Sequence, residues 1–215
     1  MPTRGLVGVL LAMCVVVAAL AGATRGFTAL TSDTARMLDV ARRPTSVTPL
    51  ALVDRRGQPH ALHDPARSTI VDVIYTRCVT VCSELGGVFQ QLQSSIRTLG
   101  LTDRIRLLSV SFDPAWDTPA RLDRYATLMR ADSAIWTLTA PQDTAALTGF
   151  LRALGIRVIA DGQNGFVHNA ALHVIDPKGR LVAIVPVGAS DAAIAAALRH
   201  APERVQQART AARAP

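Results

Sequence analysis

The sequence predicts an α/β fold in which a central mixed sheet is flanked by helices and preceded by an N-terminal β-hairpin. Apolar, largely β-branched runs alternate with segments whose apolar residues recur at helical spacing; the runs are residues 70–75, 106–112 and 135–138. Residues 170–175 and 181–187 then flank a turn at 176–179, which is the pattern of a closing hairpin. Strands that alternate with helices favour a parallel centre, to which the closing hairpin adds antiparallel strands.

The first hairpin is expected over residues 49–62, where apolar residues stand before and after a polar turn at 54–57. Thr118 followed by Pro119 is a preferred pair for a helix start. Thr144 and Ser190 are expected to cap two later helices, the first of which Gly155 should close. The expected helices are residues 85–99, 119–129, 144–154 and 190–198.

The chain is expected to divide into a leader, a tether, one folded domain and a tail. Residues 6–23 form an uncharged apolar run after Arg4, which indicates a signal peptide or a membrane anchor. Either way, we expect export to the bacterial periplasm, with residues 6–23 holding the chain at the inner membrane if they are retained. The expected parts are residues 1–24 as leader or anchor, 25–47 as tether, 48–201 as the domain and 202–215 as a basic tail.

The composition argues against nucleic-acid binding. The formal net charge is +7, but the basic residues are dispersed along the chain, and all except Lys178 are arginines. Only nine aromatic residues occur in 215, so few side chains are available to stack on bases. A domain of this length can also bury a large core without covalent cross-links. The cysteines are therefore not needed to hold a small scaffold together.

Residues 70–82 carry the side chains best suited to a chemical function. A buried-strand pattern is followed by Arg77, Cys78 and Cys82, and a helical pattern begins just after them. Thiols near a helix N-terminus meet unpaired N–H groups and the positive end of the helix dipole, and both favour the thiolate. The Cys-x3-Cys spacing leaves three interpretations open. The pair could be a structural disulfide, a redox-active dithiol, or part of a metal site in which two soft thiolates select Cu(I).

A third ligand would favour the metal site, and His168 is the candidate, because it stands in a loop just before the strand at 170–175. His173 lies inside that strand and is expected to pack or to face solvent. Asp113 follows the strand at 106–112, just as Cys78 follows the strand at 70–75. The carboxyl ends of parallel strands meet at one edge of a sheet, so we expect Cys78 and Asp113 to be neighbours in space.

Three separated motifs, in this order, resemble those of the Sco/SenC family. They are Thr76-Arg77-Cys78-Val79-Thr80-Val81-Cys82, then Ser111-Phe112-Asp113-Pro114 with Asp117-Thr118, then Val167-His168 ahead of Asp176-Pro177-x-Gly179. The resemblance covers about residues 48–200. It implies a thioredoxin-like fold with an N-terminal hairpin and a long loop that carries the histidine. It also implies one copper ion per chain, Cu(I) or Cu(II), bound by Cys78, Cys82 and His168, with Asp113 in the outer shell.

The resemblance further implies a partner, the subunit that carries the CuA site of a cytochrome c oxidase, or another copper or thiol protein. The chain would deliver copper to that site or keep its cysteines reduced, so a metallochaperone is favoured over an enzyme. The alternative is a thiol–disulfide oxidoreductase that uses Cys78 and Cys82 on exported partners without copper. The family's usual Cys-Pro-x-x-Cys-Pro is altered here, because Val79 and Ser83 replace both prolines. Val167 replaces a residue that is often acidic, and Asn169 replaces a common serine.

Overall fold

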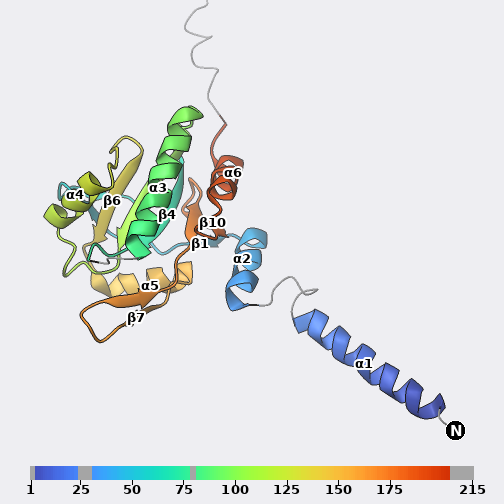
Figure 1. The fold of residues 1–215 in the computed structure, drawn as a ribbon. Coiled ribbons are helices and arrows are strands. Elements are labelled where there is room, and N and C mark those ends of the chain that lie inside the picture. The colour runs from blue at the N-terminus through green and yellow to red at the C-terminus, as the bar shows by residue number, and fades with distance from the viewer. Residues whose placement is uncertain (1–2, 24–30, 78–80, 204–215) are drawn as a thin grey trace, which may run out of the picture.

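The computed structural model describes residues 3–23, 31–77 and 81–203, with the side chains of residues 3, 4, 6 and 81–84 outside that description. Figure 1 shows the ribbon. The helices are α1 Thr3–Ala23, α2 Ser32–Arg42, α3 Val81–Thr98, α4 Pro119–Leu128, α5 Thr144–Leu154 and α6 Ser190–His200. The strands are β1 Thr45–Ser46, β2 Leu52–Asp54, β3 Pro59–His60, β4 Ser68–Ile74, β5 Ile105–Ser111, β6 Trp136–Pro141, β7 Val158–Ala160, β8 Phe166–His168, β9 Leu172–Ile175 and β10 Arg180–Val185.

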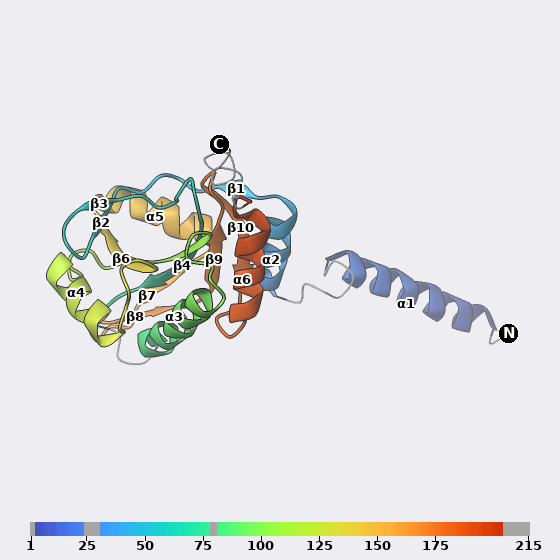
Figure 2. The same cartoon turned by 90° about the horizontal axis from the view of Figure 1, so that it is seen from above.

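Eight of the described strands form one mixed sheet in the order β1-β10-β9-β4-β5-β6-β2-β3. β4, β5 and β6 are parallel neighbours, and the other pairs of this sheet are antiparallel. Figure 2 shows α3 and α6 together on one side of the central strands and α5 on the other. The predicted α/β class, parallel centre, N-terminal hairpin (β2 and β3) and closing hairpin (β9 and β10) are therefore confirmed.

The two central strands, β4 and β5, are buried along their whole length. Because they are parallel and in register from Ser68 opposite Ile105 to Ile74 opposite Ser111, both end at the same edge of the sheet. The main-chain N–H of Phe112 still donates to the Ile74 oxygen across 3.0 Å just beyond the last pair. The residues that follow β4 and β5 are thus held side by side, as the sequence predicted.

Two expectations about local structure need correction. The expected tether contains α2, which begins where the Thr31 side chain accepts a hydrogen bond from the Thr34 N–H. Its Val40 is 4% exposed and belongs to the core, so this helix packs on the domain. At α5 the cap is Asp143, whose carboxylate accepts from the Ala145 N–H at 2.7 Å. A charged acceptor one residue earlier replaces the predicted Thr144 cap.

Of two further predictions about helix ends, the one for Gly155 is confirmed and the one for Ser190 is wrong. Gly155 closes α5 in the left-handed conformation with φ of 77°, as predicted, since a residue without Cβ adopts that region at no steric cost. Ser190 is the first residue of α6 and not its cap, because Ala189 occupies the cap position and makes no side-chain hydrogen bond. Within the part of the chain that the structure describes, no helix combines the length and apolar character needed to cross a membrane. The parts assigned to residues 1–24 and 202–215 stay predictions.

Candidate metal centre

The predicted cysteine ligands lie at the start of α3. Cys78 lies outside the described residues, as does the side chain of Cys82. The backbone places Cys82 second in α3, because this helix begins at Val81 and not at residue 85, where the sequence predicted its start. In the described residues, no three histidine, cysteine or acidic side chains come together as possible metal ligands. The described part of the candidate site consists of His168, the residues that lead into Cys78, and the side chains that contact them.

His168 is the last residue of β8, which pairs with β7 to form a second, two-stranded sheet. In that hairpin His168 stands opposite Val158, and Phe166 stands opposite Ala160. The segment that was expected to be a long loop is therefore partly a β-hairpin. An antiparallel pair restricts the main chain on both sides of the histidine, so the ring has a more definite position than a free loop would give it.

An aromatic cluster joins this hairpin to the ends of β4 and β5. The ring centroid of Phe112 lies 5.1 Å from the imidazole of His168, and that of Tyr75 lies 6.0 Å from it, both in edge-to-face arrangements. Tyr75, Phe112 and Phe166 also contact one another at 5.0 to 5.4 Å. Such contacts stabilise a fixed mutual orientation of the rings. They hold His168 beside Tyr75, three residues before Cys78.

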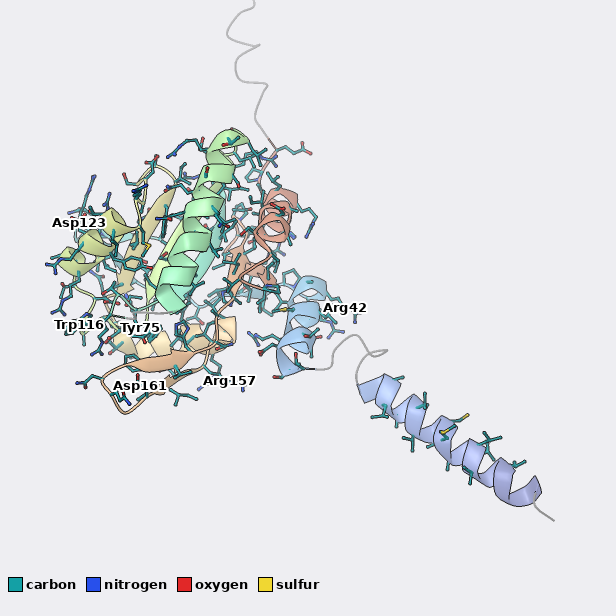
Figure 3. All side chains as sticks on the ribbon, in the orientation of Figure 1. Arg42, Tyr75, Trp116, Asp123, Arg157 and Asp161 are labelled. Atoms are coloured by element: carbon teal, nitrogen blue, oxygen red, sulfur yellow. The ribbon has the colours of Figure 1, made fainter. Side chains whose placement is uncertain are left out.

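A hydrogen bond strengthens the same junction. The Tyr75 hydroxyl donates to the main-chain oxygen of Phe166 across 2.9 Å, and the Phe166 N–H lies 3.3 Å from the same hydroxyl oxygen. Tyr75 is 5% exposed, so this bond is protected from water. Figure 3 shows Tyr75 near the first turn of α3, on the side of the β7–β8 hairpin.

The imidazole of His168 has one nitrogen partnered and one not. Nδ1 lies 3.0 Å from the main-chain oxygen of Asn169, which assigns the N–H to Nδ1. Nε2 is buried and has no hydrogen-bond partner among the described residues. Burial also lowers the pKa of His168, partly offset by the hydrogen bond to Asn169, so the ring is held neutral. A metal-binding imidazole is neutral and typically donates the N–H of one ring nitrogen to a carbonyl or carboxylate. That hydrogen bond orients the other nitrogen toward the metal.

Asp113 lies near the segment that leads into Cys78, and its carboxylate contacts Arg77. Its Oδ2 accepts from Nε and Nη2 of Arg77 at 2.9 and 2.7 Å, and its carboxylate is largely buried. The loop that carries Asp113 is braced from within, since the Asp113 N–H donates to the Ser111 hydroxyl at 3.0 Å. Arg77 directly precedes Cys78, so Asp113 offsets positive charge next to that thiol. Its predicted place in the outer shell fits this position but stays a prediction.

Asp117 belongs to the second of the three motifs and has a positioning role that the sequence did not indicate. It is 1% exposed, and its carboxylate accepts hydrogen bonds from the Ser111 hydroxyl at 2.5 Å and from both the hydroxyl and the N–H of Thr76. Burial raises the pKa of Asp117, while its hydrogen bonds oppose that rise. The carboxylate ties the end of β5 to the second residue before Cys78. A buried acid just before a helix cap gives no sequence signal that distinguishes it from an exposed one.

His173, which the sequence left between packing and solvent, packs. It is fully buried in β9, with Nε2 at 3.0 Å from the main-chain oxygen of Leu154. Burial lowers its pKa to about 4, so the ring is neutral. Its contacts lie at the end of α5, and the structure gives it no part in the site around His168.

Comparison with known proteins identifies the family of this chain. The sequence model of the SCO1/SenC family matches residues 39–203, most of the chain. The chain belongs to the SCO1/SenC family. The chain is also similar to a protein of Stutzerimonas stutzeri, provisionally named as copper-binding, with 28% identity over 148 residues, covering 65% of this chain and 68% of that protein.

Solved Sco structures share the fold. BsSco, described as a member of the Sco family of cytochrome c oxidase assembly proteins, superposes with a TM-score of 0.62 at 17% identity, covering 73% of this chain and 95% of that one. Yeast Sco1 with copper bound gives a TM-score of 0.59 at 15% identity, covering 80% and 96%. At this identity the likeness shows the fold, which is thioredoxin-like as expected. The family prediction and the fold class are therefore confirmed, while the assignment of Cys78, Cys82 and His168 as ligands remains a prediction.

Proposed function

We propose that this chain binds one copper ion as cargo through Cys78, Cys82 and His168. The observation that carries the proposal is the buried Nε2 of His168, which has no hydrogen-bond partner among the described residues. The neutral ring is oriented on a hairpin that packs beside the last residues before Cys78. Two thiolates suit Cu(I), and an added imidazole also suits Cu(II). The copper-bound yeast Sco1 structure and the copper-binding name of the S. stutzeri relative support the same cargo.

We propose further that the copper passes to the CuA site of an exported cytochrome c oxidase-type subunit. The description of BsSco as an oxidase assembly protein supports this class of client. Transfer would proceed by ligand exchange, in which thiolates of the client replace those of Cys78 and Cys82 one at a time. The chain's own residues supply the fixed imidazole and the charged pair Arg77–Asp113 beside the exchanging thiols.

We also propose that the chain works outside the cytoplasm, because the apolar residues 6–23 follow Arg4 in the pattern of an export signal. A fusion of residues 1–30 to a reporter enzyme that is active only after export tests this. We expect activity in the periplasm, and sequencing the N-terminus of the mature protein then distinguishes a removed signal from a retained anchor. A reporter that stays inactive overturns the proposed location.

Copper titration of the reduced chain, followed by absorption and paramagnetic resonance, tests the metal proposal. We expect one equivalent to bind with a strong thiolate-to-Cu(II) charge-transfer band, which Cys78→Ser abolishes and His168→Ala weakens. His63→Ala is the matched control, because His63 is exposed and lies at the other end of the domain's sequence from His168. Equal loss in both histidine variants, or no stoichiometric binding at all, contradicts the proposal.

A second candidate function is thiol–disulfide exchange without copper. It is favoured by one observation, the position of Cys82 in the first turn of α3 with Arg77 next to Cys78. One thiolate would attack a partner disulfide and form a mixed disulfide. The other would then release the reduced partner, leaving Cys78 and Cys82 oxidised for an external thiol reductant to restore. Retained exchange activity in His168→Ala without any copper binding in the parent chain would favour this function.

A further inference from the structure

A basic groove opens beside the proposed copper site, at the edge of the sheet where β4 ends and α4 begins. Its volume is about 230 Å³. Residues after β4, in the loop after β5 and along α4 line it, among them Thr76, Arg77, Trp116, Arg121, Arg124 and Leu128. We call it the arginine–tryptophan groove. Figure 3 shows Trp116 on the same side of the molecule as Tyr75, near the start of α3.

The centre of the groove is Trp116, whose ring is contacted by two guanidinium groups. The Arg121 guanidinium carbon lies 3.5 Å from the ring centroid, and that of Arg77 lies 5.0 Å from it. Arg121 also donates to the main-chain oxygen of Trp116 at 2.8 Å. The loop beneath is fixed, because the N–H groups of Trp116 and Asp117 both donate to the Asp113 oxygen. Arg77 and Arg121 are therefore held in place before any ligand arrives, which lowers the entropy lost on binding.

The positive charge of the groove is only partly balanced. Asp113 pairs with Arg77, whereas the described contacts of Arg121 are with Trp116 alone and include no carboxylate. Arg124 is exposed and has no ion pair among the described side chains. It follows Arg121 by three positions in α4, so both lie on one face of the helix. The nearest acid in sequence, Asp123, is already paired with Arg55 at 3.1 Å.

Apolar surface lies next to this charge. Trp116 is 38% exposed and Leu128, in the last turn of α4, is 70% exposed. Large apolar side chains exposed beside arginines that have no carboxylate partner among the described residues are typical of a protein-binding surface, since Trp and Arg dominate the energetics of such contacts. The groove also adjoins the His168 hairpin, because the Arg77 guanidinium lies 5.5 Å from the Phe166 ring.

We propose that the arginine–tryptophan groove binds an acidic segment of the protein that exchanges copper or thiols with this chain. Carboxylates of that segment would pair with Arg121 and Arg124, while an apolar side chain would cover Trp116 and Leu128. The identity of the segment as part of the client rests on the proposed function. Arg77 lines this groove and directly precedes Cys78 in the sequence. A protein whose acidic segment binds in the groove would therefore be held next to Cys78.

The test uses the full chain in detergent and a short dye-labelled peptide rich in glutamate with one leucine, followed by fluorescence anisotropy. We expect saturable binding that weakens as salt rises and that is lost for the same peptide with glutamine in place of glutamate. Arg121→Gln and Arg124→Gln should each weaken binding about tenfold, since each removes a charged hydrogen-bond donor. Arg124→Gln is the decisive variant, because Arg124 makes no described contact on which folding depends.

Arg199→Gln is the matched control, since Arg199 is exposed on α6 and the substitution changes the net charge by the same amount. Equal weakening by this variant, or equal binding of the glutamine peptide, overturns the proposal. So does binding to anionic phospholipid vesicles through Arg121 and Arg124 without binding to the peptide. Copper titration of the same variants separates the two proposals. Intact copper binding with no peptide binding overturns the groove alone, whereas peptide binding without copper binding overturns the copper function alone.

Discussion

The hydroxyl of Tyr75 and the main-chain oxygen of Phe166 lie 2.9 Å apart, although 91 positions separate the two residues in the chain. This bond joins the end of β4, which leads to Cys78, to the hairpin that carries His168. The same hydroxyl lies within reach of the Phe166 N–H. One side chain therefore partners both main-chain groups of a residue two positions before the proposed imidazole ligand.

Tyr75→Phe should weaken both copper binding and the fold. The substitution keeps the ring contacts but removes a buried hydrogen bond, which typically contributes about 1 kcal/mol. We expect the free energy of unfolding to fall by that amount, measured by denaturant titration, and the copper affinity to fall severalfold because the hairpin around His168 loses its fixed position. An unchanged copper affinity alongside reduced stability would show that Tyr75 supports the fold only.

Asp117→Ala should be strongly destabilising. It leaves the hydroxyls of Ser111 and Thr76 and the Thr76 N–H without their buried acceptor, and we expect a loss of roughly 3 kcal/mol in the free energy of unfolding. Asp123→Ala is the control, since Asp123 makes an exposed ion pair with Arg55 and such pairs contribute at most about 1 kcal/mol. Similar losses in the two variants would contradict the anchoring role of Asp117.

Asp72→Asn should stabilise the fold increasingly as pH rises. Asp72 is 1% exposed in β4, and burial raises its pKa from 3.8 to about 7, although the neighbouring Ser109 hydroxyl opposes that rise. Between these values the folded chain keeps a proton that the unfolded chain releases. The stability that Asp72 contributes is thus complete below pH 3.8 and is lost as pH rises through about 7.

Asn cannot ionise, so the free energy of unfolding of the variant minus that of the parent should rise over this window. This difference in the free energy of unfolding should reach about 4 kcal/mol, because each pH unit between the two pKa values contributes about 1.36 kcal/mol. Thermal melting of both proteins at pH 4 and pH 8 measures it. His173 acts in the opposite sense, since burial lowers its pKa to about 4 and stability is lost as pH falls below 6.5. The comparison at each pH cancels that contribution, and a difference that does not grow with pH sinks the prediction.

Gly86 and Gly87 in α3 should respond oppositely to alanine. A Cβ at Gly86 would meet the Met129 sulfur and would lie 3.0 Å from the Tyr125 hydroxyl, whereas a Cβ at Gly87 meets nothing within 4 Å. Gly87→Ala should stabilise the protein by roughly 0.5–1 kcal/mol, since alanine favours a helix interior. Gly86→Ala should cancel or reverse that gain by forcing α3 and α4 apart. Equal stabilisation by both substitutions, measured by denaturant titration, would show that Met129 moves aside freely.

The sequence alone determined the alternation of strands and helices in the domain, the parallel centre and both hairpins of the main sheet. These features follow from local signals, such as β-branched runs, helical periodicity and turn residues, which act over a few positions and need no knowledge of distant contacts. The motifs around Cys78, Asp113 and His168 were also enough to identify the family. The helix α2 escaped prediction because it depends on burying Val40 in the core of the domain, and the segment itself has no sustained apolar period.

The relationships around the proposed copper site were decided only by the tertiary structure. Asp117 as the buried acceptor for Thr76, Tyr75 as the partner of Phe166, and Arg121 on the face of Trp116 all join different elements or loops. The hairpin of β7 and β8 likewise replaced an expected loop, because its short strands pair with each other and pack on an aromatic cluster from β4 and β5. Burial sets the pKa values of Asp72 and His168, and burial depends on what the whole chain brings around a residue, which its neighbours in sequence do not specify.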